Sequence, residues 1–544
     1  MATATVTVPD PTAAGDPTPS GRRGATLWDR ARDLAVSRPA VADRLALAGV
    51  LVALAGLWGR GRHVWYWLDE GLSVGISSHH LGAIAGAMRQ DGSPPLYYWL
   101  LHVWISVFGT SEERTHLLSL AIALAAVAAA WWMGRSLFGR RAGWAIVALY
   151  ALSPYLAVYA NETRMYALVV LLATVATGAF LHAFVWRRRR YLPVFTVALV
   201  LMLYTHNWAL LFAGGAAAAL VPCWLAAADR GRLAMDALAA FGLAGLAFLP
   251  WLPTLGYQVA HTAAPWAERP TLDVVRQNLA DLLGGTEAVV AVGLAAGAAL
   301  AALLRPPLRR TALAVVAAAT MAVMPAALGW AASQRGSSIW SYRYLAVVLP
   351  GLLVVAGVGL GRAGRAGIGG LAVLAFLTAP IDASVPLFKK SNLRGVVEAM
   401  APTLRPGDLV ISPDYGEVPL LWHYLPPGLR LATTEGLVPD PRVSDQRDGV
   451  ERLRHSRLQT ALPPLVASVP VGGHVLVVCP PVTAPALDQV EFITLTLARC
   501  DDTNHLVLDD PTLGVVQKVE SSGDLDVLHT PVNAYLLERR APPA

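Results

Sequence analysis

Long apolar stretches separated by short arginine clusters constrain the fold of this 544-residue chain more than any other feature. A membrane-spanning helix needs about 20 mainly apolar residues. The candidate stretches are 44–60, 117–134, 142–160, 164–186, 191–206, 208–227, 234–252, 286–304, 311–332, 341–361 and 366–382. Only 15% of the residues are charged, against about 25% in soluble domains. The sequence therefore predicts a polytopic α-helical membrane protein with about 11 spans.

Arginine predicts which ends of the spans face the cytoplasm, because cytoplasmic loops carry an excess of positive charge. The clusters are Arg22/Arg23/Arg30/Arg32, Arg135/Arg140/Arg141, Arg187–Arg190, Arg230/Arg232, Arg305/Arg309/Arg310 and Arg362/Arg365. If all clusters face the cytoplasm, each pair of neighbouring clusters must be separated by an even number of spans. This holds along the whole chain only if the shorter apolar segment 94–108 does not cross the membrane. We therefore predict one long outer loop, 61–116, in which 94–108 is an interfacial or re-entrant helix. In the alternative topology 94–108 is a span and the cluster around Arg135 lies outside.

Two regions without long apolar stretches flank the spans. Residues 1–40 are rich in Thr, Pro, Ala and Arg and are predicted to be a disordered cytoplasmic tail. Residues 41–383 form the predicted membrane domain, and 384–544 form a soluble α/β domain outside the cytoplasm. In this domain we expect strands at 409–411, 474–479, 491–497, 513–519 and 532–538, and helices near 391–400, 416–424 and 448–460. The preference for arginine over lysine and the abundant Ala and Gly suggest a GC-rich bacterial genome, so we expect a multi-pass protein of the bacterial plasma membrane.

The chain has three cysteines, Cys223, Cys479 and Cys500, and no two have the spacing of metal ligands. Cys223 lies in an apolar stretch and is expected to be a buried small hydrophobic residue. Cys479 and Cys500 both belong to the predicted soluble domain. We expect two isolated thiols, and a disulfide in an oxidising compartment is the alternative.

An acidic pair, Asp69-Glu70, follows the first span within an aromatic run. Carboxylates at a membrane surface are costly unless something compensates for their charge, and ligand binding or catalysis is the usual reason. In the favoured topology the same outer face carries Glu162, Arg164, His206, Arg343 and Tyr344. The predicted cytoplasmic loops carry mostly arginine and glycine. We therefore predict chemistry on the outer face; a solvated loop and interfacial arginines are the alternatives.

Several short motifs recur in a recognisable order along residues 45–360. They are Asp69-Glu70, Pro94-Pro95-Leu96-Tyr97-Tyr98-Trp99-Leu100-Leu101-His102 leading to Phe108-Gly109, Gly134-Arg135-Ser136-Leu137-Phe138-Gly139, Ser153-Pro154, Asn161-Glu162-Thr163-Arg164-Met165-Tyr166, Tyr204-Thr205-His206-Asn207-Trp208 and Arg343-Tyr344. In these the chain resembles the bacterial branch of the GT-C glycosyltransferases, in the dolichyl-phosphate-mannose–protein mannosyltransferase group (family 39). The resemblance implies a membrane enzyme that transfers a sugar, with mannose or arabinose as the leading candidates, from a polyprenyl-phosphate donor to an outer-face acceptor with inversion.

The resemblance implies a role for each candidate residue. Asp69 matches the acid of the family's first loop and would be the base that takes the proton of the acceptor hydroxyl. The leaving lipid phosphate needs positive charge, and guanidinium groups suit its oxygens; Arg343 is the first candidate and Arg164 the second. The remaining predicted substrate-binding residues are Glu70, Glu162, His206 and Tyr344. No metal is predicted, although Asp69, Glu162 and His206 are an alternative ligand set for a divalent ion.

The acceptor would be a cell-envelope glycan, lipid or protein. No β-trefoil domain is inserted between the spans, as it is in the eukaryotic protein mannosyltransferases, and this argues against a protein. Nucleic acid is not expected as a partner. The rival functions are a transporter or flippase of lipid-linked sugars and a non-catalytic envelope assembly protein. Convergence of Asp69, Glu162 and Arg343 on one outward cavity would favour the enzyme.

Overall fold

The computed structural model describes residues 39–262, 264–303, 305, 310–384, 390–481, 490–521 and 530–541. The chain divides into two units, Met1–Ala53 and Leu54–Ala544. The first unit contributes only the start of α2 (Pro39–Trp58) to the described residues. The predicted disordered tail 1–40 therefore lies almost wholly outside them. All further description concerns the second unit.

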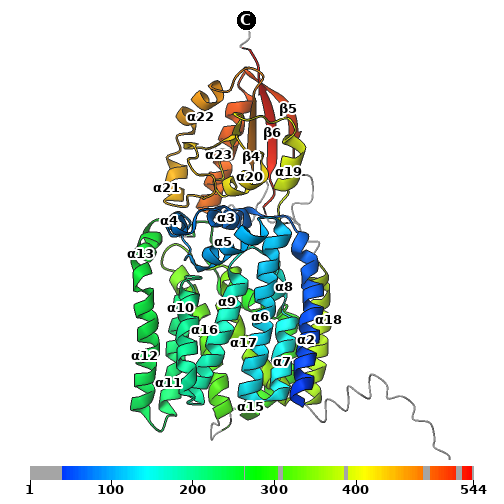
Figure 1. Cartoon of the computed structure of the whole chain (residues 1–544), viewed down its shortest axis with the longest axis vertical. Coiled ribbons are helices and arrows are strands. Elements are labelled where there is room, and N and C mark those ends of the chain that lie inside the picture. Colours follow the sequence, from blue (N-terminus) through cyan, green and yellow to red (C-terminus); the bar gives the residue numbers. More distant parts are fainter. Residues whose placement is uncertain are drawn as a thin grey trace, which may run out of the picture. The chain divides into compact units, whose positions relative to one another are not determined.

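The larger unit contains a body of helices that covers each predicted span except 44–60, which falls mostly on α2 (Figure 1). These helices are α6 (Glu112–Phe138), α7 (Arg140–Ala151), α8 (Pro154–Tyr159), α9 (Tyr166–Phe180), α10 (Leu192–Leu203), α11 (Ala209–Leu225), α12 (Arg230–Phe248), α13 (Leu252–His261), α14 (Leu272–Asp281), α15 (Thr286–Leu303), α16 (Arg310–Ser333), α17 (Leu349–Arg362) and α18 (Arg365–Ser384). The expected span 142–160 is two helices, because Ser153 caps α8 and Pro154 is its first residue. Within the described residues, six helices of the whole chain are long and apolar enough to cross a membrane.

The loop predicted at 61–116 is itself largely helical. It contains α3 (Leu68–Ser77), α4 (Leu81–Asp91) and α5 (Leu96–Phe108). Helix α5 has 13 residues, which is about 20 Å at 1.5 Å per residue and shorter than a hydrocarbon core of about 30 Å. The length of α5 supports the expectation that 94–108 does not cross, which stays a prediction.

The C-terminal region is an α/β fold around a mixed sheet with the strand order β3-β2-β1-β4-β6-β5. The strands are β1 (Leu409–Ile411), β2 (Arg430–Thr433), β3 (Gly436–Leu437), β4 (His474–Cys479), β5 (Leu513–Val519) and β6 (Asn533–Arg539). Strand β1 pairs in parallel with β2 and β4, and the other pairs are antiparallel. The helices are α19 (Leu393–Met400), α20 (Val418–Tyr424), α21 (Gly449–Arg454), α22 (Leu458–Ala467) and α23 (Glu491–Leu508).

Two expectations for this region are corrected. Residues 491–497 are not a strand but the start of α23, whose buried residues Thr496, Cys500, Thr503 and Val507 recur with a helical period. The helix expected at 448–460 is two short helices, α21 and α22. Cys223, Cys479 and Cys500 are free thiols, but Cys479 and Cys500 are not isolated from each other, because the Cys479 thiol lies 3.9 Å from the Cys500 carbonyl oxygen.

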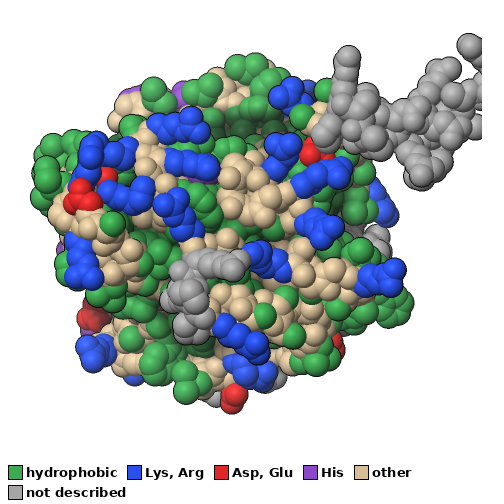
Figure 2. Space-filling view, turned by 90° about the horizontal axis from the view of Figure 1, so that it is seen from below, with side chains coloured by type: hydrophobic (Ala, Val, Ile, Leu, Met, Phe, Trp, Pro, Cys, Tyr) green, Lys and Arg blue, Asp and Glu red, His purple; other side chains and the backbone are tan. Residues whose placement is uncertain are grey.

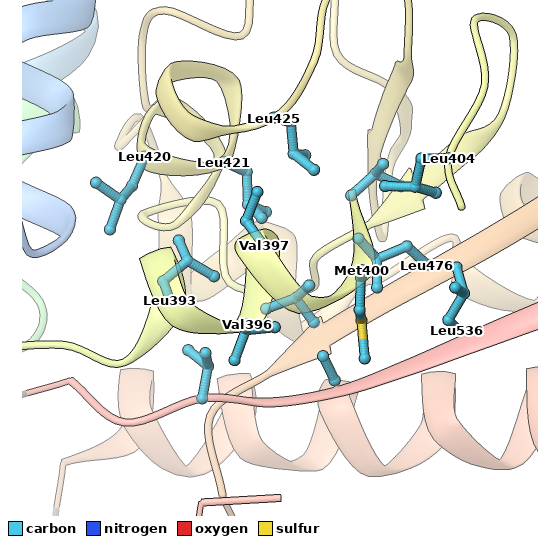
Figure 3. Close-up of a cluster of buried hydrophobic side chains, with 14 of the residues drawn as sticks. Leu393, Val396, Val397, Met400, Leu404, Leu420, Leu421, Leu425, Leu476 and Leu536 are labelled. Carbon is cyan, nitrogen blue, oxygen red and sulfur yellow. The ribbon is translucent and has the colours of Figure 1, made fainter. Parts of the chain in front are cut away.

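A shared hydrophobic core joins the C-terminal fold to the loop 61–116. Leu393, Leu420 and Leu476 pack in the cluster that Figure 3 shows, and Tyr66 and Val74 belong to the same cluster. A side chain at Gly71 or at Gly75 would overlap the backbone of α20 or of Arg442, respectively. Helix α3, which begins with the acidic pair, is therefore fixed closely against the C-terminal fold.

Candidate functional site

The acidic pair lies in the first turn of α3, immediately after the extended residue Trp67. Negative charge is favoured at this end of a helix, because the unpaired backbone N–H groups leave a partial positive charge there. Successive residues of an α-helix point about 100° apart. The side chains of Asp69 and Glu70 therefore enter different surroundings.

Asp69 faces two guanidinium groups. Its Oδ2 lies 2.5 Å from Nη1 of Arg343 and 3.6 Å from Nη2 of Arg164. Arg343 is in the short helical segment Tyr342–Val347 that precedes α17, and its guanidinium also lies 4.3 Å from the ring centre of Trp266. Nη1 of Arg164 donates to the hydroxyls of Ser73 and Tyr98. These contacts hold two positive charges around one carboxylate at the start of α3.

Glu70 is fully buried and is bound by three groups away from this cluster. Its carboxylate lies 2.6 Å from Nε2 of His116 and 2.7 Å from Nζ of Lys390, and it accepts from the backbone N–H of Thr163 at 2.7 Å. Burial alone would raise the pKa of Glu70, but Lys390 and His116 outweigh it and lower the pKa to about 2. Lys390 also donates to the carbonyl of Asn161. Groups of the protein thus occupy the Glu70 carboxylate. The expectation that Glu70 binds substrate stays a prediction.

Glu162 lies in the loop between α8 and α9 and is also buried. Its Oε1 has no hydrogen-bond partner among the described residues. Burial raises the pKa of Glu162 to about 7, and the nearby carboxylates Glu70 and Asp69 act in the same direction. Glu162 is not among the residues that line the cavity described next.

A cavity of about 500 Å³ brings five of the seven predicted residues together. They are Asp69, Arg164, His206, Arg343 and Tyr344. His206 lies between α10 and α11, where its Nδ1 accepts from the backbone N–H of Trp208 at 3.1 Å, and its ring packs on Tyr344. Of the three residues whose convergence would favour an enzyme, Asp69 and Arg343 line this cavity and Glu162 does not.

The cavity also contains polar residues that sequence reasoning did not select. Asp91 is partly buried, which raises the pKa of its carboxyl group, and Tyr98 donates to it at 3.3 Å. The acidic start of the motif Asp91-Gly92-Ser93-Pro94-Pro95 was the available signal. Gln258 and Gln446 line the cavity from α13 and from the C-terminal fold. Nothing in their local sequence marks either glutamine.

No group of three or more His, Cys, Asp or Glu side chains is arranged to hold a metal ion within the residues that the structure describes. The alternative ligand set of Asp69, Glu162 and His206 is therefore not assembled there. Two guanidinium groups next to Asp69 also disfavour a cation, because like charges repel strongly in a buried site.

The sequence matches the model of one protein family, described as dolichyl-phosphate-mannose-protein mannosyltransferase, over residues 92–257. No curated protein matches the chain. Among solved structures, ArnT from Cupriavidus metallidurans in the apo state has 14% sequence identity and a TM-score of 0.62 over 93% of this chain and 100% of that chain. The same protein bound to undecaprenyl phosphate has 13% identity and a TM-score of 0.60 over 91% of this chain and 99% of that chain.

A third similar structure is the Archaeoglobus fulgidus oligosaccharyltransferase tethered with an acceptor peptide. It has 14% identity and a TM-score of 0.54 over 84% of this chain and 72% of that chain. These matches confirm the predicted resemblance and the predicted GT-C fold, and together with the family model they indicate a glycosyltransferase. They also support the assignment as a multi-pass membrane protein.

Proposed function

We propose that the chain is an inverting glycosyltransferase that moves a sugar from a polyprenyl-phosphate donor to a hydroxyl acceptor on the outer face of the membrane. The observation that carries this proposal is the cluster of Asp69, Arg164 and Arg343 on the wall of one cavity. A carboxylate can take a proton, and two guanidinium groups can bind a phosphate. Both functions are needed at one place for this reaction.

The transfer balances with these groups alone. Asp69 takes the proton of the acceptor hydroxyl while the oxygen of that hydroxyl bonds to the anomeric carbon of the sugar. The bond between that carbon and the phosphate oxygen breaks, and the polyprenyl phosphate leaves with the electron pair. Arg343 and Arg164 stabilise the charge that develops on the phosphate, where fixed charges are most effective. Attack opposite to the leaving phosphate inverts the anomeric carbon.

Donor binding would also activate the base. Nη1 of Arg343 lies 2.5 Å from the carboxylate of Asp69, and an ion pair of this kind favours the charged carboxylate over its protonated form. A donor phosphate competes for the same guanidinium group. A phosphate bound to Arg343 would therefore leave the Asp69 carboxylate free to accept the proton of the acceptor hydroxyl.

Three amide oxygens on the cavity wall suit the sugar. The amide nitrogens of Asn207, Gln258 and Gln446 donate to Gly92 O, to Met88 O and to the Ser444 hydroxyl, at 3.0, 2.7 and 2.8 Å. The amide oxygens of the same three residues are buried and have no partner within the described part of the chain. An unpaired buried acceptor is unfavourable, and a sugar hydroxyl can donate to it. This donor subsite lies in the same cavity as the phosphate-binding arginines.

The similar structures support a lipid-linked donor. ArnT has been seen with undecaprenyl phosphate, and the archaeal oligosaccharyltransferase with an acceptor peptide. Mannose and arabinose are the sugars we propose first, with a cell-envelope glycan, lipid or protein as the acceptor. The bacterial plasma membrane, with the cavity on its outer side, is the proposed location.

The direct test incubates purified full-length protein with labelled polyprenyl-phosphate mannose or arabinose and membrane acceptors. We expect label to move from the lipid to an acceptor with an inverted anomeric configuration. The Gln258→Leu variant should use the donor less well while binding unglycosylated polyprenyl phosphate as the wild type does, because that lipid has no sugar. Failure of the wild-type protein to release polyprenyl phosphate from either donor would refute the proposal for these sugars.

A further inference from the structure

A second cavity, of about 900 Å³, lies at the far ends of the helices that frame the candidate site. Helix α9 begins next to Arg164, and α11 begins next to Trp208; their other ends reach the second cavity, as does the start of α16. Helix α16 has 24 residues, or about 36 Å at 1.5 Å per residue. The two cavities therefore open at opposite membrane surfaces if these helices span the bilayer.

Positive charge and apolar surface meet in this second cavity. Its charged lining residues are Arg187, Arg189, Arg232, Arg310 and Asp229, and its apolar lining includes Phe184, Val185, Leu225, Leu313 and Val316. Figure 2 shows this end of the molecule, where Lys and Arg side chains are many and Asp and Glu side chains few. The combination of a cationic rim and apolar walls suits an anion with a hydrocarbon chain.

The backbone at the cavity is irregular. Helix α9 continues as a π-helical turn, Leu181–Val185, and Arg187 then adopts a left-handed conformation with φ = 58°. Both features are uncommon, and both are found more often at functional sites than elsewhere. They turn the chain so that Arg187 and Arg189 reach the same carboxylate. Nη2 of Arg187 and Nη2 of Arg189 lie 3.3 and 2.7 Å from the oxygens of Asp236, whose side chain is 2% exposed.

The charges do not cancel within the protein. Asp236 orients Arg187 and Arg189, and the Asp229 side chain accepts from the backbone N–H of Arg232. Arg232 and Arg310 have no ion pair within the described residues. Nη1 of Arg187 is buried and has no hydrogen-bond partner there. The lining thus offers two guanidinium groups that Asp236 holds, those of Arg187 and Arg189, and two that no ion pair neutralises within the described residues, those of Arg232 and Arg310.

We propose that this cavity binds the phosphate headgroup of an anionic phospholipid, in the leaflet opposite to the candidate active site. Guanidinium groups bind phosphate oxygens in pairs, and basic pockets between membrane helices are known to hold anionic headgroups. The apolar walls would receive the first part of an acyl chain, which free phosphate lacks. General attraction to the membrane does not explain the arrangement, because the equally exposed Arg362 and Arg365 at the same end do not line this cavity.

The test measures lipid binding to the purified full-length protein by native mass spectrometry. Phosphatidylglycerol and phosphatidylcholine are added separately, and inorganic phosphate is added as a competitor. The wild type should retain phosphatidylglycerol in preference to phosphatidylcholine. The Arg232→Gln/Arg310→Gln variant should bind phosphatidylglycerol about thirtyfold more weakly, which corresponds to two arginine contacts. The matched control Arg362→Gln/Arg365→Gln should bind it as the wild type does.

Each other result overturns the proposal. Equal weakening in the control pair would show only general surface charge, and unchanged binding in the Arg232/Arg310 variant would show that the cavity is not the site. Displacement of the lipid by millimolar inorganic phosphate would identify free phosphate as the ligand. If the double variant does not fold, the single variant Arg310→Gln, at an exposed position, should still weaken phosphatidylglycerol binding about fivefold.

Discussion

Asp69 holds the position from which a base can serve the cavity, and its amide variant tests that role. Asp69→Asn keeps the size of the side chain but cannot accept a proton, so the transfer rate should fall by about 10²–10⁴-fold. Labelled-sugar transfer with purified protein measures this rate. Asp273→Asn, which changes an acid with a 93% exposed side chain, should transfer as the wild type does. Turnover near the wild-type level in Asp69→Asn would remove Asp69 from the role of base.

Substitutions of Arg343 should impair use of the donor to different degrees. Lysine keeps the charge but loses the paired donors of the guanidinium group, so Arg343→Lys should weaken donor use partly and Arg343→Ala severely. Both effects should appear when the donor is varied below saturation, and not when the acceptor is varied. The exposed Arg335 supplies the control variant Arg335→Ala. If Arg343→Ala left donor dependence unchanged, Arg164 would become the phosphate-binding residue.

The buried carboxyl group of Glu162 should make the stability of the folded protein depend on pH. Its pKa is raised to about 7 by burial and by nearby carboxylates, whereas an unfolded Glu has a pKa of about 4.3. Between these values the folded state binds more protons than the unfolded state, so stability falls as the pH rises through this window. Thermal unfolding of wild type and Glu162→Gln should therefore diverge from pH 5 to pH 8, with the wild type losing more. Parallel curves would contradict the raised pKa.

At the scale of elements, the sequence predicted the helices well and their long-range contacts poorly. Apolar length located the helices of the membrane body, although 142–160 is two helices, and the motifs singled out Asp69, Arg164, His206 and Arg343, which meet at one cavity. Lys390 was missed because its partner Glu70 is 320 residues away, and no local pattern encodes such a pair. The strand expected at 491–497 failed because β-branched and apolar residues there favour a strand, whereas packing over the whole of α23 follows a helical period.

The Lys390–Glu70 pair links the start of the C-terminal region to the first turn of α3, and a double-mutant cycle tests that link. Lys390→Met leaves a buried carboxylate without its cation, which typically costs about 3–5 kcal/mol. Adding Glu70→Gln should recover much of this loss, because no unpaired charge then remains. Thermal unfolding of the two single variants and the double variant gives the coupling free energy between Lys390 and Glu70. Lys518→Met, in a pair whose lysine is 59% exposed, should have little effect. Additive losses at the two buried positions would exclude the coupling.

At the scale of the whole molecule, the candidate site is built from both parts of the larger unit. Gln446 of the C-terminal fold lines the cavity, and its backbone N–H donates to the carbonyl of Gln90 at 3.0 Å. Asp440 and Asp448 of the same region bind His79 and His261. The cavity and the C-terminal fold must therefore lie at the same membrane surface, so the location of one determines the location of the other.

The orientation of the chain is the last prediction, and it follows from the arginine clusters at the opposite helix ends. If those clusters face the cytoplasm, residues 384–544 and the cavity lie outside. A C-terminal alkaline phosphatase fusion should then be active, because this reporter works only outside the cytoplasm. The same reporter placed at Gly364, between α17 and α18, should be inactive. Activity at Gly364 with an inactive C-terminal fusion would reverse the topology, and a polyprenyl-phosphate donor would then have to be used on the cytoplasmic side.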